Sequence, residues 1–277
     1  MSRLRVAALT LVVAAALAAL GGILFIYFGA YDPAALSQHS RFTNWMLHTV
    51  ALNSIGRRAR DVKVPDLTDP EKIGRGLNLY RQNCLQCHGA PGEPPASFAM
   101  GLMPGAPPME QVAREWPANQ IYWVVKNGIK MTAMPAWHFR MTDSELWDVV
   151  AFVETMPKLS PADYRAQVAA YTASPEDKGA AAPGPVDAER GRLALAQYAC
   201  TSCHVIPGVI APAGHVGPTL AGVRDRSILA GLLANTPENT IEWIRHPQQV
   251  KPGNAMPEMG VTEQDARDMA AYLVTLK

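Results

Sequence analysis

All four cysteines of this 277-residue chain lie in two short stretches. Residues 83–89 read NCLQCHG and residues 199–205 read ACTSCHV, so each stretch has two cysteines, two residues between them and a histidine directly after. Residues of these types form disulfides, bind zinc, exchange electrons as thiols or hold a haem. The spacing and the surrounding sequence separate these four chemistries.

Three of the four interpretations leave part of the pattern unexplained. A disulfide suits an oxidising compartment but does not require a histidine at the same place twice. A zinc site favours two neighbouring Cys-x-x-Cys pairs or a later pair of histidines, whereas these motifs begin 116 residues apart. A thioredoxin-like redox motif needs a βαβ pattern around it, and none is evident.

Covalent haem attachment explains the whole pattern. In Cys-x-x-Cys-His, the two thiols add to the haem vinyl groups and the histidine is held beneath the iron as its proximal ligand. Two copies with no cysteine left over predict two covalently bound haem c groups. The predicted attachment residues are Cys84, Cys87, Cys200 and Cys203, and the predicted proximal ligands are His88 and His204.

Each motif is followed by a candidate second iron ligand. A low-spin electron carrier typically places Met opposite His, and the soft, neutral thioether raises the reduction potential because it favours ferrous iron. Met-Pro occurs at Met134, 46 residues after His88, and at Met256, 52 residues after His204. The sequence therefore predicts Met134 and Met256 as the distal ligands.

The flanks of the two motifs also repeat. Residues 119–123 (NQIYW) precede the first Met-Pro, and residues 239–243 (NTIEW) precede the second. After each Met-Pro comes a helix start, with a capping box at 142–145 (TDSE) and a close variant at 262–265 (TEQD). This repeat of about 120 residues predicts two related domains. Residues 173–187, rich in Ala, Pro, Gly and charge, are typical of a flexible linker between them.

The N-terminal segment predicts where these domains lie. Residues 6–30 carry no charge, and a helix of this length crosses a hydrocarbon core of roughly 30 Å. A cleaved signal peptide is the alternative, but its apolar region is usually shorter, about 7–15 residues. Two arginines precede the segment, so the positive-inside rule predicts a single-pass helix in a bacterial inner membrane, with the later residues on the periplasmic side.

Residues 31–65 connect the membrane segment to the first domain. Apolar residues at roughly helical spacing, followed by arginines, predict a short helix here that either lies on the membrane surface or packs on the first domain. The residues are Phe42, Trp45, Met46, Leu52, Ile55, Arg57, Arg58 and Arg60.

Composition excludes some functions and favours others. A net charge of +1 provides no basis for a polyanion-binding surface, so no nucleic-acid partner is predicted. The 21 glycines and 23 prolines favour small, loop-rich domains. No Ser/His/Asp arrangement, Gly-rich phosphate loop or placeable carboxylate pair points to catalysis.

The two Cys-x-x-Cys-His motifs, the two Met-Pro motifs and the helices around each resemble the class I cytochromes c. The first domain looks like cytochrome subunits of membrane-bound dehydrogenases, and the second is similar to cytochrome domains fused to haem–copper oxidases, notably in KPGNAMP. The resemblance implies an all-α chain: an N-terminal transmembrane helix followed by two tandem class I cytochrome c domains. The expected segments are an anchor (1–30), a connecting segment (31–65), domain 1 (66–172), a linker (173–187) and domain 2 (188–277).

The resemblance also implies contacts around each haem. The N- and C-terminal helices of each domain are expected to cross, with Gly76 and Tyr80 at the crossing in domain 1. In domain 2, Leu195 and Tyr198 are out of step with the family pattern, so no equivalent contact is assigned. The family places a prolyl carbonyl against the proximal histidine N–H. Pro218 matches this position for His204, and for His88 the candidates are Pro107 and Pro108, with Pro108 taken forward.

Several other residues compete for the iron. Met131 and Met259 lie three residues from the predicted ligands but are not followed by Pro, and His215 follows the second motif closely. Three more methionines lie in a Pro/Gly-rich loop and are expected to pack or face solvent: Met100, Met103 and Met109.

The resemblance implies an electron carrier that is not itself an enzyme. It would relay single electrons in a respiratory chain, from a quinol-oxidising complex or dehydrogenase towards a terminal oxidase, with respiratory complexes or soluble cytochromes as donor and acceptor. An alternative is a fixed cytochrome subunit of a haem–copper oxidase or membrane dehydrogenase complex. A dihaem peroxidase and a disulfide-stapled binding module are further hypotheses. The first needs a haem without a distal ligand, and the second would be colourless.

Overall fold

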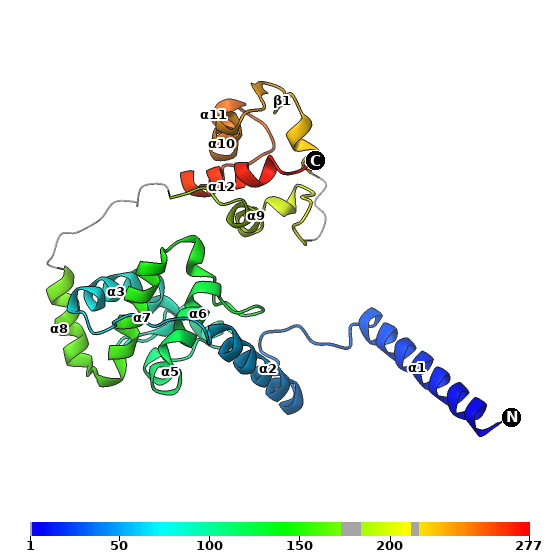
Figure 1. Ribbon diagram of the computed structural model, residues 1–277, viewed down its shortest axis with the longest axis horizontal. Helices are drawn as coiled ribbons and strands as arrows, with labels where there is room; N and C mark the ends of the chain where they lie inside the picture. Colours follow the sequence, from blue (N-terminus) through cyan, green and yellow to red (C-terminus); the bar gives the residue numbers. More distant parts are fainter. Residues whose placement is uncertain (1, 173–183, 212–215) are drawn as a thin grey trace. The chain divides into compact units, whose positions relative to one another are not determined.

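The computed structural model describes residues 2–172, 184–211 and 216–277. The chain divides into two compact units, Met1–Ser174 (unit 1) and Pro175–Lys277 (unit 2), shown in Figure 1. Most of the predicted linker, residues 173–183, lies outside the described residues, and so does His215.

The first helix, α1 (Arg3–Tyr27), is exposed along its whole length. Among the described residues it is the one helix that is long and apolar enough to cross a membrane. A signal sequence near an N-terminus meets the same two criteria.

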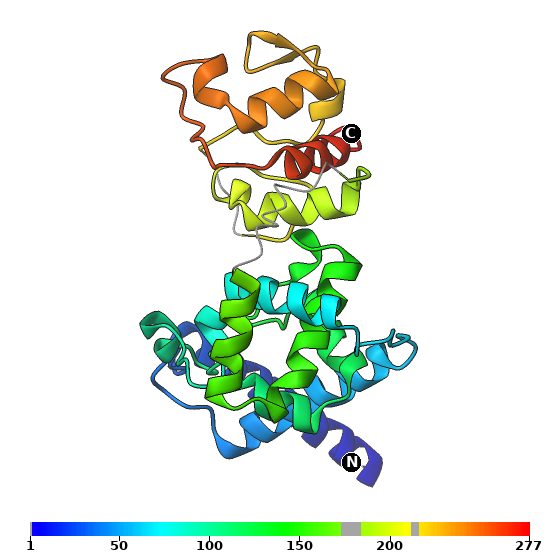
Figure 2. The same cartoon turned by 90° about the vertical axis from the view of Figure 1, so that its left-hand side faces the viewer.

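Unit 1 is otherwise a bundle of helices and short 3-10 turns. They are α2 (Arg41–Ala59), α3 (Pro70–Asn83), α4 (Leu85–His88), η1 (Ser97–Gly101), α5 (Met109–Glu115), α6 (Ala118–Asn127), η2 (Trp137–Phe139), α7 (Asp143–Thr155), η3 (Met156–Lys158) and α8 (Pro161–Thr172). Helix α3 lies across α7, and α5, α6 and α8 pack around this pair (Figures 1 and 2). The core at the crossing is aromatic, with Tyr80, Phe152 and Tyr164 at most 1% exposed.

Unit 2 repeats this plan with fewer elements. They are α9 (Ala188–Gln197), η4 (Cys200–Ser202), η5 (Val223–Asp225), β1 (Ile228–Leu229), β2 (Leu233–Ala234), α10 (Pro237–Arg245), α11 (Pro247–Val250) and α12 (Glu263–Leu273). Helix α12 packs on α9 and α10. The predicted all-α class is confirmed, and the described residues include one small antiparallel hairpin, in which Leu229 pairs with Leu233.

The main helices begin where the sequence supplies caps. Asp69 accepts a hydrogen bond from the amide of Glu71 at the start of α3, and Pro70 occupies the first helical position, where its missing N–H costs nothing. At the start of α7, Thr142 and Glu145 form a complete capping box. These caps set the ends of the two helices that cross.

In each unit, the helix before the cysteine motif crosses the helix after Met-Pro, and a glycine lies at the point of closest approach. A Cβ atom on Gly76 would lie 1.9 Å from the carbonyl oxygen of Asp148, and a Cβ on Gly191 would lie 1.9 Å from the carbonyl oxygen of Asp268. No side chain fits between backbones this close, so glycine is required at both positions.

The crossing in domain 2, which the family pattern left unassigned, therefore exists and contains Leu195. Four residues after the crossing glycine stands Tyr80 in α3 and Leu195 in α9, and these side chains are 1% and 3% exposed. The two sequences looked out of step because unit 2 has one more residue between its crossing glycine and the first cysteine of its motif than unit 1 has. Ala199 takes up that residue in the left-handed conformation, with φ at 54°.

Helix α2 is only partly packed on unit 1. Its C-terminal end contacts α6: Ile55 and Ala59 are buried, and the side-chain amide of Asn119 donates to the carbonyl of Ala59 at 2.8 Å. Its N-terminal half, including Phe42 and Trp45, is exposed. The C-terminal end of α2 thus packs on the first domain, as one of the two alternatives predicted, whereas its N-terminal half does not.

Candidate cofactor sites

Each Cys-x-x-Cys-His motif forms a single helical turn after its crossing helix. The amide of His88 donates to the carbonyl of Cys84 at 3.0 Å, and the amide of His204 donates to the carbonyl of Cys200 at 2.9 Å. Residues three and four apart on such a turn share a face. Both cysteines and the histidine of each motif are therefore on one side of the turn, as attachment at two points and ligation at a third require.

Burial disfavours the thiolate form at two of the four cysteines. All four cysteines are free, and burial raises the pKa of Cys84 to about 12 and raises the pKa of Cys200 as well. A thiol with a raised pKa is mostly protonated at neutral pH, which disfavours its binding a metal ion directly. In the part of the chain that the structure describes, no group of three or more His, Cys, Asp and Glu side chains could hold a metal ion. Two free cysteines and a histidine on one turn fit covalent attachment to a haem.

Both imidazoles are oriented by a prolyl carbonyl. Nδ1 of His88 lies 2.8 Å from the carbonyl oxygen of Pro107, and Nδ1 of His204 lies 2.7 Å from that of Pro218. A carbonyl only accepts, so Nδ1 carries the proton and Nε2 keeps its lone pair for a metal. Burial lowers the pKa of His88 although the hydrogen bond to Pro107 opposes this, so the neutral form that ligates is favoured.

The carbonyl next to His88 belongs to Pro107, which corrects the candidate Pro108. Pro108 is the N-cap of α5, and its carbonyl accepts from the amides of Gln111 and Val112, both at 3.2 Å. That oxygen is already used as the first acceptor of the helix. The preceding carbonyl remains for the imidazole.

The chain also passes close to the ring of His204. A Cβ atom on Gly217 would lie 2.4 Å from Cε1 of that imidazole, so only glycine lets the backbone approach. The amide of Gly217 donates to the carbonyl of Cys203 at 2.9 Å, which attaches this segment to the motif. Sequence reasoning selected Pro218 but missed Gly217, although a glycine directly before that proline is a signal of close approach.

The loop around Met134 is held at the backbone of the methionine itself. Its amide donates to Oγ1 of Thr132 at 3.1 Å, and its carbonyl accepts from the amide of Ile129 at 3.2 Å. Gly128 has φ at 67°, and a Cβ there would lie 2.8 Å from the carbonyl of Met134. The half-buried side chain packs against the core of unit 1, which includes Cys84.

Unit 2 holds Met256 in the same way with different residues. The amide of Met256 donates to Oδ1 of Asn254 at 2.7 Å, and its carbonyl accepts from Nε2 of Gln248 at 2.7 Å. In both units the side chain two residues before the methionine thus accepts its N–H. Such bonds fix the loop that presents the thioether.

The other methionines considered as iron ligands are either exposed to solvent or packed in the core. Met131 is 99% exposed with φ at 59°, and Met259 is 42% exposed. Met100 and Met103 are exposed too, whereas Met109 is buried in the core of unit 1. These positions suit solvent-facing or packing side chains.

The donor sets of both units fit a c-type haem. Each offers two free thiols and an imidazole on one face of a turn, with the imidazole proton held on Nδ1. Each also offers a half-buried thioether on a fixed loop. Soft sulfur and imidazole nitrogen are the axial donors of haem electron carriers.

Comparison with known families matches each unit separately. Residues 71–153 match the family described as cytochrome C oxidase, cbb3-type, subunit III. Residues 188–277 match the family described as cytochrome c. The matched stretches contain both Cys-x-x-Cys-His motifs and both Met-Pro motifs.

Similar proteins are subunits of oxidases. Cytochrome c oxidase subunit 2 of Alkalihalophilus pseudofirmus is 34% identical over 116 residues, which cover 42% of this chain and 32% of that protein. The same-named subunit of Bacillus sp. (strain PS3) is 36% identical over 88 residues, 30% of this chain and 25% of that protein. The cbb3-type cytochrome c oxidase subunit CcoP of Azospirillum brasilense is 29% identical over 93 residues, 32% of this chain and 30% of that protein. The chain thus spans between a quarter and a third of the length of these relatives.

The family matches and the geometry agree on the cofactor. Two cytochrome c domains imply two covalently bound haem c groups, and each domain supplies one Cys-x-x-Cys-His turn for them. The chain therefore contains two cytochrome c domains in tandem behind an apolar N-terminal helix.

Proposed function

We propose that this protein is a membrane-anchored dihaem cytochrome c that relays single electrons towards a terminal oxidase. One observation carries the proposal: the two units repeat the same local arrangement of motif turn, prolyl carbonyl and fixed Met-Pro loop. Two similar sites in one chain suit the passage of an electron from one carrier to the next.

In each unit, two cysteines would attach the haem covalently, a histidine would be the proximal ligand and a methionine would be the distal ligand. The assignments are Cys84, Cys87, His88 and Met134 in unit 1, and Cys200, Cys203, His204 and Met256 in unit 2. When bound, each haem supplies a one-electron ferric/ferrous couple. If the histidine and the methionine of each unit both bind the iron, no coordination position would remain for a substrate, which would favour electron transfer over catalysis.

The prolyl carbonyls and the methionines would both affect the reduction potential of the haem. Pro107 and Pro218 hold the Nδ1 proton, which fixes the imidazole plane and makes Nε2 a stronger donor. The neutral thioethers of Met134 and Met256 favour the ferrous state and raise the reduction potential.

The direction of electron flow is proposed from the relatives. Electrons come from a quinol-oxidising complex or a dehydrogenase and leave towards a terminal oxidase, since the similar proteins are named as oxidase subunits. Helix α1 keeps the units at the membrane, and Arg3 and Arg5 at its start put them on the periplasmic side. Tethering raises the effective concentration of the carrier near its membrane partners, so tight binding is not needed.

A second candidate is a fixed subunit of a haem–copper oxidase or a membrane dehydrogenase. The likeness of unit 1 to a named oxidase subunit favours it. Purification from native membranes in mild detergent separates the two. A fixed subunit co-purifies in constant ratio with its complex, whereas a relay is recovered alone.

Optical spectroscopy of the purified protein tests the ligand assignments. We expect two c-type haems per chain, a Met-to-iron absorption band in the ferric form, and no carbon monoxide binding in the ferrous form. Met134→Leu and Met256→Leu should each open one iron to carbon monoxide and lower one potential. Met131→Leu and Met259→Leu, which remove exposed methionines nearby, should leave both sites closed. Carbon monoxide binding by the wild-type protein would refute the closed-site relay.

A further inference from the structure

The N-terminal half of α2 carries apolar side chains that nothing in unit 1 covers. Phe42, Trp45, Met46 and Val50, here called the α2 stripe, are 67%, 61%, 41% and 62% exposed. Exposed large apolar groups this close together are unusual on a soluble surface. Patches of this kind mark surfaces that interact with proteins or membranes.

The α2 stripe faces away from the domain. Its members follow one another at intervals of three, one and four residues, which places them on one side of a helix. Ile55 and Ala59, which pack against unit 1, lie on another side of the same helix. At 100° per residue the two sides are roughly 130° apart. The helix therefore holds the domain with one face and presents the stripe with another.

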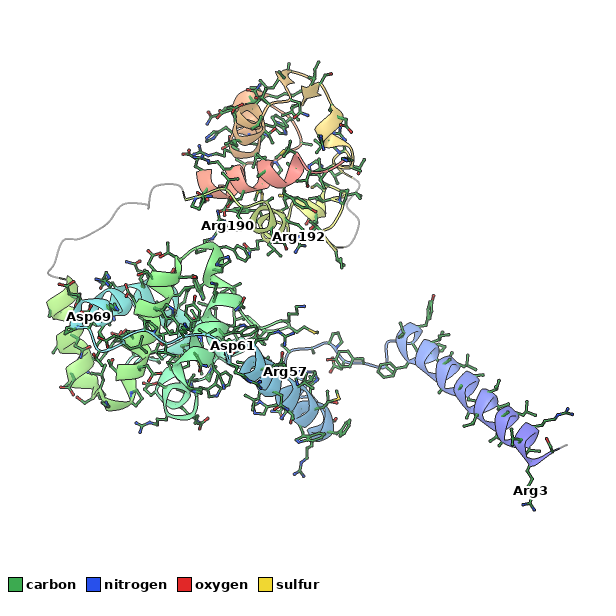
Figure 3. All side chains as sticks on the ribbon, viewed as in Figure 1. Arg3, Arg57, Asp61, Asp69, Arg190 and Arg192 are labelled. Atoms are coloured by element: carbon green, nitrogen blue, oxygen red, sulfur yellow. The ribbon has the colours of Figure 1, made fainter. Side chains whose placement is uncertain are left out.

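Positive charge continues the stripe along the helix. Next to Val50, the residues Asn53, Ser54, Arg57 and Arg58 line a shallow hollow on the surface of α2; Arg57 is labelled in Figure 3. Residues 33–60 contain four arginines and no Asp or Glu. An apolar stripe beside a cationic patch complements an anionic lipid surface, with acyl chains under the stripe and phosphates at the arginines.

The chain keeps α2 close to a bilayer. Helix α1 ends at Tyr27 and α2 begins at Arg41, so 13 residues join them. Fully extended, that connection reaches no more than about 50 Å. If α1 spans the membrane, phospholipid is always within reach of the stripe, whereas any protein partner has to arrive.

We propose that α2 is a membrane-docking helix whose stripe inserts among the headgroups of anionic phospholipids and whose arginines bind their phosphates. Trp45 and Phe42 suit the interface because aromatic rings prefer this depth of the bilayer. Docking holds unit 1 on the membrane surface through its contact with α6. The proposal rests on α1 spanning the membrane and is independent of the haem assignments, which spectroscopy tests separately.

Hydrogen exchange of the full-length holoprotein in lipid nanodiscs tests this. Backbone amides of residues 41–50 should exchange at least about tenfold more slowly in discs containing phosphatidylglycerol than in the triple variant Phe42→Gln, Trp45→Gln, Val50→Gln in the same discs. The three side chains are exposed, and Gln is a good helix former, so the fold is retained. Ile228→Gln with Leu232→Gln is the matched control, since it removes similarly exposed apolar groups from unit 2 and should change nothing.

Two further readouts identify lipid as the partner. Brominated lipids should quench the fluorescence component that Trp45→Phe removes. Arg57→Gln with Arg58→Gln should abolish the difference in protection between phosphatidylglycerol discs and phosphatidylcholine discs. If wild type and triple variant exchange equally fast in anionic discs, the proposal is wrong. Protection that appears only in native membranes would assign the stripe to a protein partner instead.

Discussion

Unit 1 and unit 2 build the same candidate site on different supports. The parts that both share are the motif turn, the prolyl carbonyl on the imidazole and the side-chain acceptor two residues before the methionine. The units differ in the side chains that fill the core at the helix crossing. The crossing in unit 1 is filled by Tyr80 and Phe152, whose rings lie 5.4 Å apart, and in unit 2 by aliphatic and thioether groups such as Leu195 and Met269. The residues around the candidate site are thus more alike in the two units than the cores behind them.

Unit 1 also has helices with no counterpart among the described residues of unit 2. Helix α8 returns to α3, where the hydroxyl of Tyr171 donates to the carbonyl of Pro70 at 3.0 Å and Arg81 donates to the hydroxyl of Tyr164 at 2.7 Å. Unit 2 is smaller, and a smaller domain is expected to bury a smaller fraction of its surface on folding. Small domains need a cofactor or another crosslink more than large ones do. We therefore expect unit 2 to depend more strongly on its haem.

Loss of one haem should have the largest effect and should differ between the units. Cys84→Ser with Cys87→Ser, or Cys200→Ser with Cys203→Ser, should reduce the haem content measured by pyridine haemochromogen spectra from two to one per chain. Limited proteolysis should then degrade unit 2 without haem faster than unit 1 without haem, because unit 1 retains its aromatic core. Equal degradation of the two units would contradict this difference.

Removing the crossing glycines should come next. A Cβ at Gly76 or Gly191 would lie 1.9 Å from a backbone carbonyl oxygen, and backbone cannot move aside as a flexible side chain can. Gly76→Ala and Gly191→Ala should each lower the free energy of unfolding of their unit by about 3 kcal/mol. Denaturant titration followed at the haem band measures this. Gly101→Ala and Gly184→Ala, where an added Cβ meets nothing closer than 3.9 Å, are the controls and should be nearly neutral.

Each crossing also contains an ion pair between an arginine and an aspartate, and the loss of this pair should destabilise the two units to different extents. Arg75 donates from Nε to Asp148 at 2.8 Å, and Arg190 (Figure 3) donates from Nη2 to Asp268 at 2.9 Å. The arginine side chain is 46% exposed in unit 1 and 17% exposed in unit 2. Water replaces a lost partner more easily at the exposed pair.

Arg190→Gln should therefore cost more than Arg75→Gln. We expect about 2 kcal/mol in unit 2, where the carboxylate is fully buried, and about 1 kcal/mol in unit 1. The same denaturant titration, run at low and at high salt, checks this. A larger cost for Arg75→Gln would mean that exposure does not govern these pairs.

The helix caps should show the smallest effects. Thr142 caps α7 and Thr262 caps α12, and each side chain accepts from the amide three residues later. Thr142→Ala and Thr262→Ala should each destabilise their unit by about 1 kcal/mol, measured as a shift in the midpoint of denaturation. Thr→Ser at each position should restore most of it, since serine caps equally well. A cost that serine does not restore would point to the methyl group instead.

Much of the site could be predicted because its signals are local. Cys84 and His88 are four residues apart, so one helical turn brings them together wherever that turn lies. The Met-Pro motifs and the capping sequences at Thr142 and Thr262 are likewise read within a few residues. The repeat of these signals predicted two domains, and the family matches confirmed that both are cytochrome c domains.

The errors and omissions concern residues that meet only after folding. Pro107 and Pro108 are neighbours with identical side chains, and the start of α5 decides which carbonyl is left for His88. The sequence around Leu195 looked out of register because the extra residue at Ala199 is absorbed by a left-handed turn that no composition signal marks. Both outcomes depend on backbone geometry.

Short-range spacing was thus enough to predict the cofactor and the presence of two cytochrome c domains, and it is also the basis on which the attachment residues are proposed. The tertiary structure alone decided that Gly191 lies against Asp268, that Gly217 lies against His204, and that one face of α2 is covered while another is bare. The physical reason is the range of the interactions. A helical turn is set by hydrogen bonds four residues apart, whereas a crossing or a covered face requires segments far apart in sequence to pack together.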